Sequence, residues 1–157
     1  MAFRLHREVG AMTARLAYAN ILAEDIEALS RFYIDLFGFP EIESHRSPIY
    51  RCLDAGGVEL GFNAPLAREL LNLDDTAQSR NIATSVYLTY ETSDLAEIDT
   101  LAGRAVELGG RIVKEPYDTY YNARQSVLAD PEGNVFRLNY RKGARTPAAD
   151  VENPPWR

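Results

Sequence analysis

The sequence is poor in cysteine and in uninterrupted apolar stretches, and each shortage excludes a class of protein. Its one cysteine, Cys52, rules out an internal disulfide, and no segment has the pattern of a membrane span or a secretory signal. Glycine-rich phosphate loops, nucleophile elbows and cysteine clusters are also missing. We therefore expect a cytoplasmic protein with no membrane partner, in which Cys52 is a packed core thiol rather than a nucleophile.

Positive charge is also scarce. The 157 residues include 17 Lys and Arg against 23 Asp and Glu, which gives a formal net charge of -6 at pH 7 and a pI near 5.0. Nucleic-acid binding needs clustered Lys and Arg, which this sequence lacks. We expect no nucleic-acid partner, although an acidic protein can still bind small cationic molecules.

What the sequence does contain is a clear hairpin signal near its end. Asp-Pro-Glu-Gly-Asn at 130–134 combines a proline with a preset φ and a glycine free to take a positive φ, so it predicts a tight turn. Beyond this turn Phe136, Leu138 and Tyr140 alternate with a second set of positions that includes Arg137. This alternation predicts a strand with one apolar face and one mixed, polar face, on which Arg137 lies.

The first half of the chain predicts a strand, a helix and then three strands. A strand over 16–23 precedes a helix that begins after Glu24 or Asp25 and ends at Gly38. The apolar positions of this helix lie at offsets 0, 3, 6, 7, 10 and 11 from Ile26, which is one helical stripe. The three strands are expected at 39–45, 49–54 and 58–62.

The second half repeats this order. A strand over 84–91 precedes a helix that starts at Ser93 or Asp94, where Glu97 is placed to complete a capping box from Asp94. Its apolar positions have the same offsets, 0, 3, 6, 7, 10 and 11, from Leu95. Strands are expected at 111–115, 122–129 and 135–140.

Two helices with one apolar pattern, each between one strand and three, indicate an internal duplication. A polar connection with a short helix at 66–71 joins the two halves. We therefore divide the chain into an N-terminal arm, a first βαβββ module, a linker, a second βαβββ module and a flexible tail, at residues 1–14, 15–63, 64–83, 84–140 and 141–157.

These features resemble those of the vicinal oxygen chelate superfamily, which includes glyoxalase I, bleomycin-resistance proteins and extradiol dioxygenases. The resemblance spans Tyr18 to Tyr140 and is most specific in 25–38 (DIEALSRFYIDLFG), 57–60 (GVEL) and 130–137 (DPEGNVFR). It implies an α+β fold in which two βαβββ modules curve a mixed sheet into a cup, with the helices outside. It also implies a homodimer that completes or borders each cup.

Metal-dependent members of this superfamily hold an ion on four cup strands, commonly with His on the first strand of each module and Glu on the fourth. The resemblance carries these positions to Tyr18, Glu59, either Ser85 or Tyr87, and Arg137. Only Glu59 is plainly a metal ligand. A guanidinium stays charged and has no acceptor lone pair, so Arg137 cannot coordinate a cation. We therefore predict a cup without metal or other cofactor, in which Arg137 pairs with Glu59.

The other site candidates are side chains expected to face or border the cup. Tyr18 and Tyr87 either stack on a planar ligand or fill the cup as core. Tyr120 and Tyr121 belong to a segment that the resemblance places over the cup mouth, as a gate, a surface aromatic loop or a dimer contact. The predicted ligand-binding set is Tyr18, Asn20, Glu59, Ser85, Tyr87, Tyr120, Tyr121 and Arg137.

Three functions remain open at this point, of which the third is a dimer-forming scaffold whose cup is collapsed and has no cavity. The leading hypothesis is sequestration of an aromatic or cationic small molecule in the cup, as in the metal-free bleomycin-resistance proteins that the sequence resembles. The alternative is an enzyme, for which no catalytic residue is assigned. Such an enzyme would be a glyoxalase-like lyase or isomerase, an extradiol-type dioxygenase with an altered metal site, or a metal-independent catalyst with Glu59 as base and Tyr18 as acid.

Overall fold

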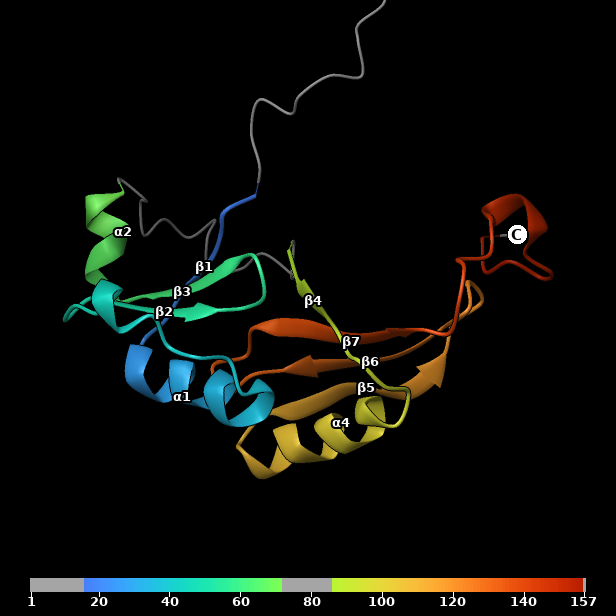
Figure 1. The fold of residues 1–157 in the computed structure, drawn as a ribbon, viewed down its shortest axis with the longest axis horizontal. Coiled ribbons are helices and arrows are strands. Elements are labelled where there is room, and N and C mark those ends of the chain that lie inside the picture. Colours follow the sequence, from blue (N-terminus) through green and yellow to red (C-terminus); the bar gives the residue numbers. More distant parts are fainter. Residues whose placement is uncertain (1–15, 72–85, 157) are drawn as a thin grey trace, which may run out of the picture.

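The computed structural model describes residues 16–71 and 86–156, and two repeated modules make up most of this part of the chain (Figure 1). The elements of the first module and the linker are β1 (Tyr18–Leu22), α1 (Ile26–Phe37), η1 (Glu43–His45), β2 (Tyr50–Asp54), β3 (Glu59–Asn63) and α2 (Leu66–Leu70). Those of the second module and the tail are β4 (Leu88–Glu91), α4 (Glu97–Glu107), β5 (Arg111–Asp118), β6 (Ala123–Ala129), β7 (Val135–Arg141) and η2 (Ala148–Asp150).

The strands form two sheets with matching topology. The first sheet has the order β1-β3-β2 and the second β4-β7-β6-β5. In each sheet the first strand of the module runs parallel to the last, and the remaining pairs are antiparallel. The expected α+β fold is therefore confirmed, and α1 and α4 lie on the same side of the two sheets (Figure 1).

Local sequence explains where α1 begins and ends. Asp25 caps its N-terminus, because the carboxylate accepts a hydrogen bond of 2.9 Å from the backbone N–H of Ala28. Gly38 ends the helix with a φ of 72°, a conformation that glycine adopts without steric cost. Both predicted ends of this helix are confirmed.

The strand expected at 39–45 is wrong. Pairing of this segment with β2 is limited to an isolated bridge between Glu41 and Leu53, after which the chain turns into η1. Arg46 donates two hydrogen bonds, of 2.8 and 2.6 Å, to the carboxylate of Glu41. This two-pronged contact holds the segment as a compact turn, so the first sheet has three strands rather than four.

The expected start of the second helix is also wrong. Helix α4 begins at Glu97, because Asp94 accepts a hydrogen bond of 2.7 Å from the backbone N–H of Ala96 and holds a turn before the helix. Glu97 does reach back, but it accepts from the backbone N–H of Ser93, at 3.2 Å, instead of completing a box with Asp94.

The core joins the two modules. Tyr33 on α1 donates a hydrogen bond of 2.8 Å to Asp130, which lies in the turn between β6 and β7 of the other module. In the same turn Glu132 accepts from the backbone N–H of Glu24 at 2.7 Å. Around these contacts lies a cluster of aromatic rings from both modules: Phe32, Tyr33, Phe37, Phe39, Tyr90 and Phe136.

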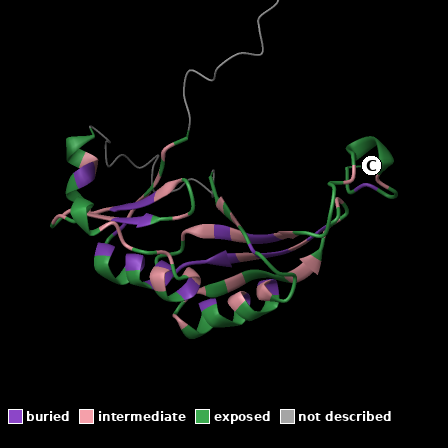
Figure 2. Cartoon of the chain, viewed as in Figure 1, coloured by how far each residue is buried: buried purple, intermediate pink, exposed green. Residues whose placement is uncertain are grey.

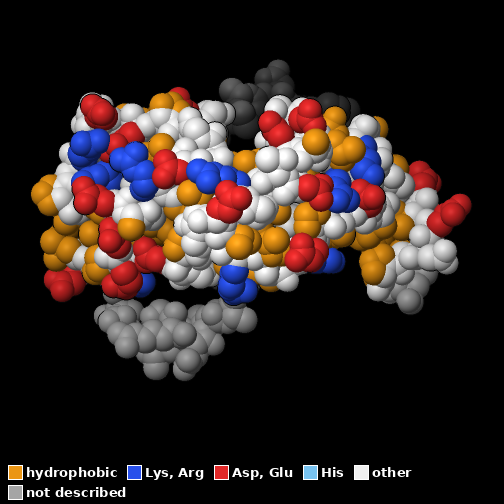
Figure 3. All heavy atoms as spheres, turned by 90° about the horizontal axis from the view of Figure 1, so that it is seen from below, with side chains coloured by type: hydrophobic (Ala, Val, Ile, Leu, Met, Phe, Trp, Pro, Cys, Tyr) orange, Lys and Arg blue, Asp and Glu red, His pale blue; other side chains and the backbone are white. Residues whose placement is uncertain are grey.

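The buried side chains lie where the helices pack against the sheets. Buried positions lie on the strands and on the sheet-facing sides of α1 and α4, whereas α2 and the C-terminal segment are mainly exposed (Figure 2). The helical side carries Lys and Arg intermixed with Asp and Glu (Figure 3), which is typical of a solvated surface. Within the described residues, no helix is both long and apolar enough to cross a membrane.

Candidate functional site

The open face of the second sheet forms a hollow of about 640 Å³. Side chains of β4, β6 and β7 line it, together with the connection between β5 and β6 and the start of the C-terminal segment. Its walls include three tyrosines and three arginines: Tyr87, Tyr120, Tyr121, Arg137, Arg141 and Arg145. We call this space the second-module hollow.

A chain of hydrogen bonds across the strands forms the floor of this hollow. Gln125 and Asn139 lie opposite each other on β6 and β7, and the amide nitrogen of Gln125 donates to Asn139 at 2.7 Å and to Tyr121 at 2.5 Å. The carbonyl oxygen of Gln125 accepts from the Tyr117 hydroxyl at 2.9 Å, and the amide of Asn139 donates to Glu91. Burial raises the pKa of Tyr117, so its phenol stays protonated and can donate. The floor is therefore fixed by its own contacts.

Arg137 projects from β7 beside the aromatic wall of the second-module hollow. Its Nε donates to Thr89, the residue opposite it on β4, at 3.2 Å, and its guanidinium carbon lies 5.2 Å from the centre of the Tyr87 ring. In the part of the chain that the structure describes, no carboxylate lies within ion-pair distance of this guanidinium. Arg137 is thus a positioned cation, and residues 16–71 and 86–156 provide no counter-ion for it.

The first module has a smaller hollow of about 240 Å³ on its own sheet. Tyr18, Asp54 and Glu59 line it, and both Tyr18 on β1 and Asp54 on β2 lie directly opposite Glu59 on β3. This first-module hollow is acidic, in contrast to the arginine-lined hollow of the second module.

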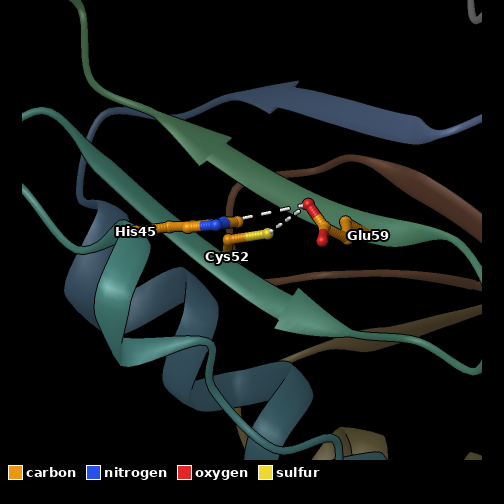
Figure 4. Close-up of side chains that lie close together, drawn as sticks. All are labelled: His45, Cys52 and Glu59. Carbon is orange, nitrogen blue, oxygen red and sulfur yellow. Dashed lines mark hydrogen bonds and ion pairs between the residues drawn. The ribbon is translucent and has the colours of Figure 1, made fainter.

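Three potential metal ligands meet at the edge of the first-module hollow (Figure 4). One oxygen of Glu59 lies 3.8 Å from Nδ1 of His45 and 3.7 Å from Sγ of Cys52. Burial is the main cause that raises the pKa of the Cys52 thiol, and the nearby Glu59 carboxylate adds to it. A hydrogen bond with Tyr50 acts in the opposite direction and favours the thiolate.

Comparison with known proteins identifies the family. The sequence model of the Glyoxalase/Bleomycin resistance protein/Dioxygenase superfamily matches residues 15–138. The chain belongs to this superfamily. A comparison with curated protein sequences finds no match.

Solved structures agree with this membership. A glyoxalase/bleomycin resistance protein/dioxygenase family enzyme from Burkholderia phytofirmans PsJN is 45% identical, with a TM-score of 0.73 over 81% of this chain and 98% of its own. A glyoxalase-related enzyme from Fulvimarina pelagi is 21% identical, with a TM-score of 0.70 over 85% of this chain and 98% of its own. A lactoylglutathione lyase from Agrobacterium tumefaciens is 19% identical, with a TM-score of 0.60 over 82% of this chain and 95% of its own. The last two similarities establish the fold alone.

The structure divides the predicted ligand-binding set of this superfamily member between the two modules. Tyr87, Tyr120, Tyr121 and Arg137 share the second-module hollow. Tyr18 and Glu59 share the first-module hollow, and the Asn20 side chain accepts a hydrogen bond of 3.1 Å from Asn63 on the same sheet. Ser85 lies outside the described residues.

The expected ion pair between Glu59 and Arg137 is not formed among the described residues. Glu59 contacts His45 and Cys52, whereas Arg137 contacts Thr89 and Tyr87. Each residue lies on the open face of its own module's sheet, and the two hollows share no lining residue. The pairing was inferred from positions that converge in metal-dependent members of the superfamily, and this chain does not bring them together.

The residues at those four superfamily positions do not fit a shared metal ion. Tyr18 and Glu59 line one hollow, whereas Tyr87 and Arg137 line the other. In addition, the guanidinium group of Arg137 has no lone pair with which to coordinate a cation. A reaction that relies on an ion at those positions is therefore not supported by the side chains present.

Sequence reasoning missed the floor of the second-module hollow and the thiol contact of the first. Gln125 and Asn139 are buried amides at strand positions, and such groups need partners, so their occurrence on neighbouring strands was a usable signal. Cys52 is buried as expected, but its proximity to His45 depends on η1, where a strand had been predicted.

Proposed function

We propose that this protein binds a small planar organic anion in the second-module hollow. Its function would then be ligand binding, and the ligand class is an aromatic compound with a carboxylate or similar group. The observation that carries this proposal is the environment of Arg137. Its guanidinium group contacts Thr89 and Tyr87, and no carboxylate of the described residues forms an ion pair with it.

The charge of the hollow favours an anion over a cation. Among the described residues that line it, Arg137, Arg141 and Arg145 are opposed by a single carboxylate, Glu91. Both oxygens of Glu91 already accept hydrogen bonds, one from Asn139 and one from the backbone N–H of Arg141. A guanidinium can bind a carboxylate through two parallel hydrogen bonds, which gives both affinity and orientation.

The walls and floor suit a flat ring. Tyr120 and Tyr121 contact each other edge to face, with ring centres 4.9 Å apart, and Arg145 lies 4.7 Å from the centre of the Tyr121 ring. Aromatic walls provide a large contact area with few rotatable bonds. The hydrogen-bonded floor needs no rearrangement to accept a ligand, which lowers the entropic cost of binding.

The proposal is tested by matched ligands. Benzoate, 4-hydroxybenzoate and 2-naphthoate would be titrated calorimetrically into the full chain, alongside the corresponding amides and benzylamine. We expect at least one acid to bind about tenfold or more tightly than its amide, because a charge-assisted bond contributes about 1.5–3 kcal/mol. Arg137→Gln should remove this preference.

Arg104→Gln is the control, because Arg104 is an exposed residue of α4 that pairs with Glu107 at 3.1 Å, away from the hollow. This variant should bind the acids as the unmodified chain does. Equal affinity for acids and amides, stronger binding of benzylamine, or no binding of any acid would contradict the proposal.

A second candidate function is proton transfer in the first-module hollow. Tyr18 and Glu59 lie directly opposite each other on β1 and β3 and line this hollow together, as an acid and a base would. Turnover of hemithioacetals, abolished by Glu59→Gln, would favour this enzymatic function over ligand binding alone.

We also propose a homodimer. Tyr18 and Tyr87, expected to face a closed cup, are 48% and 50% exposed in the single chain. A second copy that covers the two open sheet faces would bury them. Light scattering coupled to size-exclusion chromatography should give twice the chain mass of 17.6 kDa, and a monomeric mass at micromolar concentration would contradict this arrangement.

A further inference from the structure

The cluster of His45, Cys52 and Glu59 has a geometry that no feature of the ligand-binding hollow explains. We propose that these three side chains bind a zinc-like divalent cation, with its fourth position open to water. The proposal does not depend on the ligand binding proposed above, because the cluster and the second-module hollow have no residue in common.

The distances between the donor atoms suit one small ion. In a tetrahedral zinc site with Zn–S near 2.3 Å and Zn–N or Zn–O near 2.0 Å, neighbouring donor atoms lie about 3.3–3.5 Å apart. Here the Glu59 oxygen lies 3.7 Å from the Cys52 sulfur and 3.8 Å from the His45 nitrogen, and all three donors lie within 4.8 Å of one another. The two distances from the Glu59 oxygen exceed these values by a few tenths of an ångström, whereas the Cys52 and His45 donor atoms, which lie within 4.8 Å of each other, would have to approach by up to about 1.3 Å.

Two of the ligands stand on a rigid part of the fold. Cys52 on β2 pairs with Gly61, and Glu59 lies two residues before Gly61 on β3, so the two side chains are diagonal neighbours on one sheet face. Cys52 is fully buried, whereas Glu59 lines a hollow through which an ion can enter. A site on strands keeps its ligand spacing better than a site on loops.

The third ligand is held by the compact turn that replaced the predicted strand. His45 is the last residue of η1, and its backbone N–H donates to the carbonyl of Ile42 at 3.0 Å. The backbone N–H of Ile42 in turn donates to the carbonyl of Cys52 at 2.8 Å, which ties η1 directly to the strand that carries the thiol. His45 is therefore positioned by the same strand as Cys52.

Charge and ligand type select the kind of metal. Asp54 lies directly opposite Glu59, and in the described part of the chain no Lys or Arg forms an ion pair with Glu59, so this end of the sheet favours a cation. A thiolate, an imidazole and a carboxylate together suit zinc or cobalt rather than magnesium or calcium, which prefer oxygen ligands. Tyr50, hydrogen-bonded to Cys52, would stabilise the thiolate that a metal requires.

This set is distinct from the positions at which metal-dependent relatives hold their ion. It shares Glu59 with them, but its other two members lie on β2 and η1 of the same module. It therefore needs no contribution from Arg137 or from the second module.

Cobalt spectroscopy on the full chain tests the proposal. Chelator-treated, reduced protein would be titrated with Co²⁺ alone, and the thiolate-to-cobalt charge-transfer absorption recorded in the near ultraviolet. We expect saturation at one ion per chain and displacement of the cobalt by Zn²⁺. Cys52→Ser should abolish the absorption, and His45→Gln and Glu59→Gln should each weaken cobalt binding by about tenfold or more.

Glu69→Gln is the matched control, because Glu69 is an exposed carboxylate of α2. It should leave the titration unchanged. If Cys52→Ser does not fold, as judged by circular dichroism, the partly exposed His45 still provides the test through His45→Gln. The proposal would be overturned if no charge-transfer absorption appeared. It would also be overturned if neither His45→Gln nor Glu59→Gln changed the affinity for cobalt, because the thiol would then bind the ion without the other two proposed ligands.

Discussion

Gly61 lies in the middle of the open face of the first sheet, opposite Asn20 on β1 and Cys52 on β2. A Cβ atom at this position would overlap the side-chain oxygen of Asn20 and lie 2.6 Å from the hydroxyl oxygen of Tyr50. The missing side chain is what allows these polar groups to converge beside Cys52.

We expect Gly61→Ala to destabilise the fold by about 1–3 kcal/mol, because Asn20 and Tyr50 must both move to admit the methyl group. Gly103→Ala is the control. Among the described residues, no atom outside the neighbouring backbone of α4 lies within 4 Å of the Cβ position at Gly103, so alanine should stabilise this helix by about 0.5–1 kcal/mol. Urea denaturation of both variants measures the difference, and equal stability of the two would show that the first-sheet face is not tightly packed.

At the scale of single residues, the sequence predicted on which face of a strand a side chain lies better than it predicted which residues that side chain contacts. The alternation after the hairpin turn correctly placed Phe136 and Leu138 in the core and Arg137 on the polar face. It could not give the partners of Arg137, because strand alternation fixes a side chain's face and leaves open which side chains of other segments lie near it.

Among the elements, α4 and β6 are joined by an ion pair at the surface. Arg124 donates two hydrogen bonds of 2.9 Å to the carboxylate of Asp99, and the Arg124 guanidinium holds the pKa of that carboxyl below its ordinary value of 3.8. A carboxyl with a lowered pKa stabilises the fold at pH values above its ordinary range, and this contribution is lost as the pH falls through the lowered value.

Asp99→Asn should therefore destabilise the protein at pH 7, and the difference from the unmodified chain should shrink below pH 3.8. The Asp99 side chain is 54% exposed, so solvent screening limits the effect to about 1 kcal/mol or less. Asp35→Asn, at an exposed position of α1, is the control. Thermal unfolding at several pH values checks this, and a destabilisation that persists unchanged at low pH would assign the effect to something other than the ion pair.

The helices were the most predictable elements, because their apolar stripes are long and their ends carry strong signals such as Asp25 and Gly38. The segment 39–45 was mispredicted because it lies between a helix stop at Gly38 and a turn signal at Ser47-Pro48, where a strand is the simplest connection, whereas the contact of Glu41 with Arg46 decides its shape. The sequence contains both residues, but a local pattern does not show that they pair.

At the scale of the whole molecule, the link between Tyr33 and Asp130 holds the first module's helix to the second module's turn. Asp130 is 3% exposed and also accepts from the backbone N–H groups of Glu132 and Asn134, both at 3.0 Å. One carboxylate thus organises the turn and the contact between modules at once.

Tyr33→Phe should destabilise the protein by about 1–3 kcal/mol, since it removes one partner of a buried hydrogen bond. The matched control is Tyr90→Phe, because the hydroxyl of Tyr90 is buried without a hydrogen-bond partner in the described structure. That variant should be neutral or slightly stabilising. Denaturant unfolding of the two variants, run in parallel, gives the comparison. A larger loss for Tyr90→Phe would contradict the assignment.

The family and the duplicated fold were accessible from the sequence, since both rest on repeated patterns along the chain. The site was accessible only in part, because its residues come from two hollows whose separation depends on how the modules pack. Tyr87 and Arg137, which line one hollow, were predicted to belong to the site. That Tyr18 and Glu59 lie in a separate hollow was not predicted.

One folding plan occurs twice in this chain, yet its two copies present opposite charges: carboxylates at Asp54 and Glu59 on one sheet, and guanidinium groups at Arg137 and Arg141 on the other. Each of the two modules provides its own sheet as the framework for its face. A substitution in one hollow therefore changes the charge of that half of the molecule while the side chains that line the other stay the same.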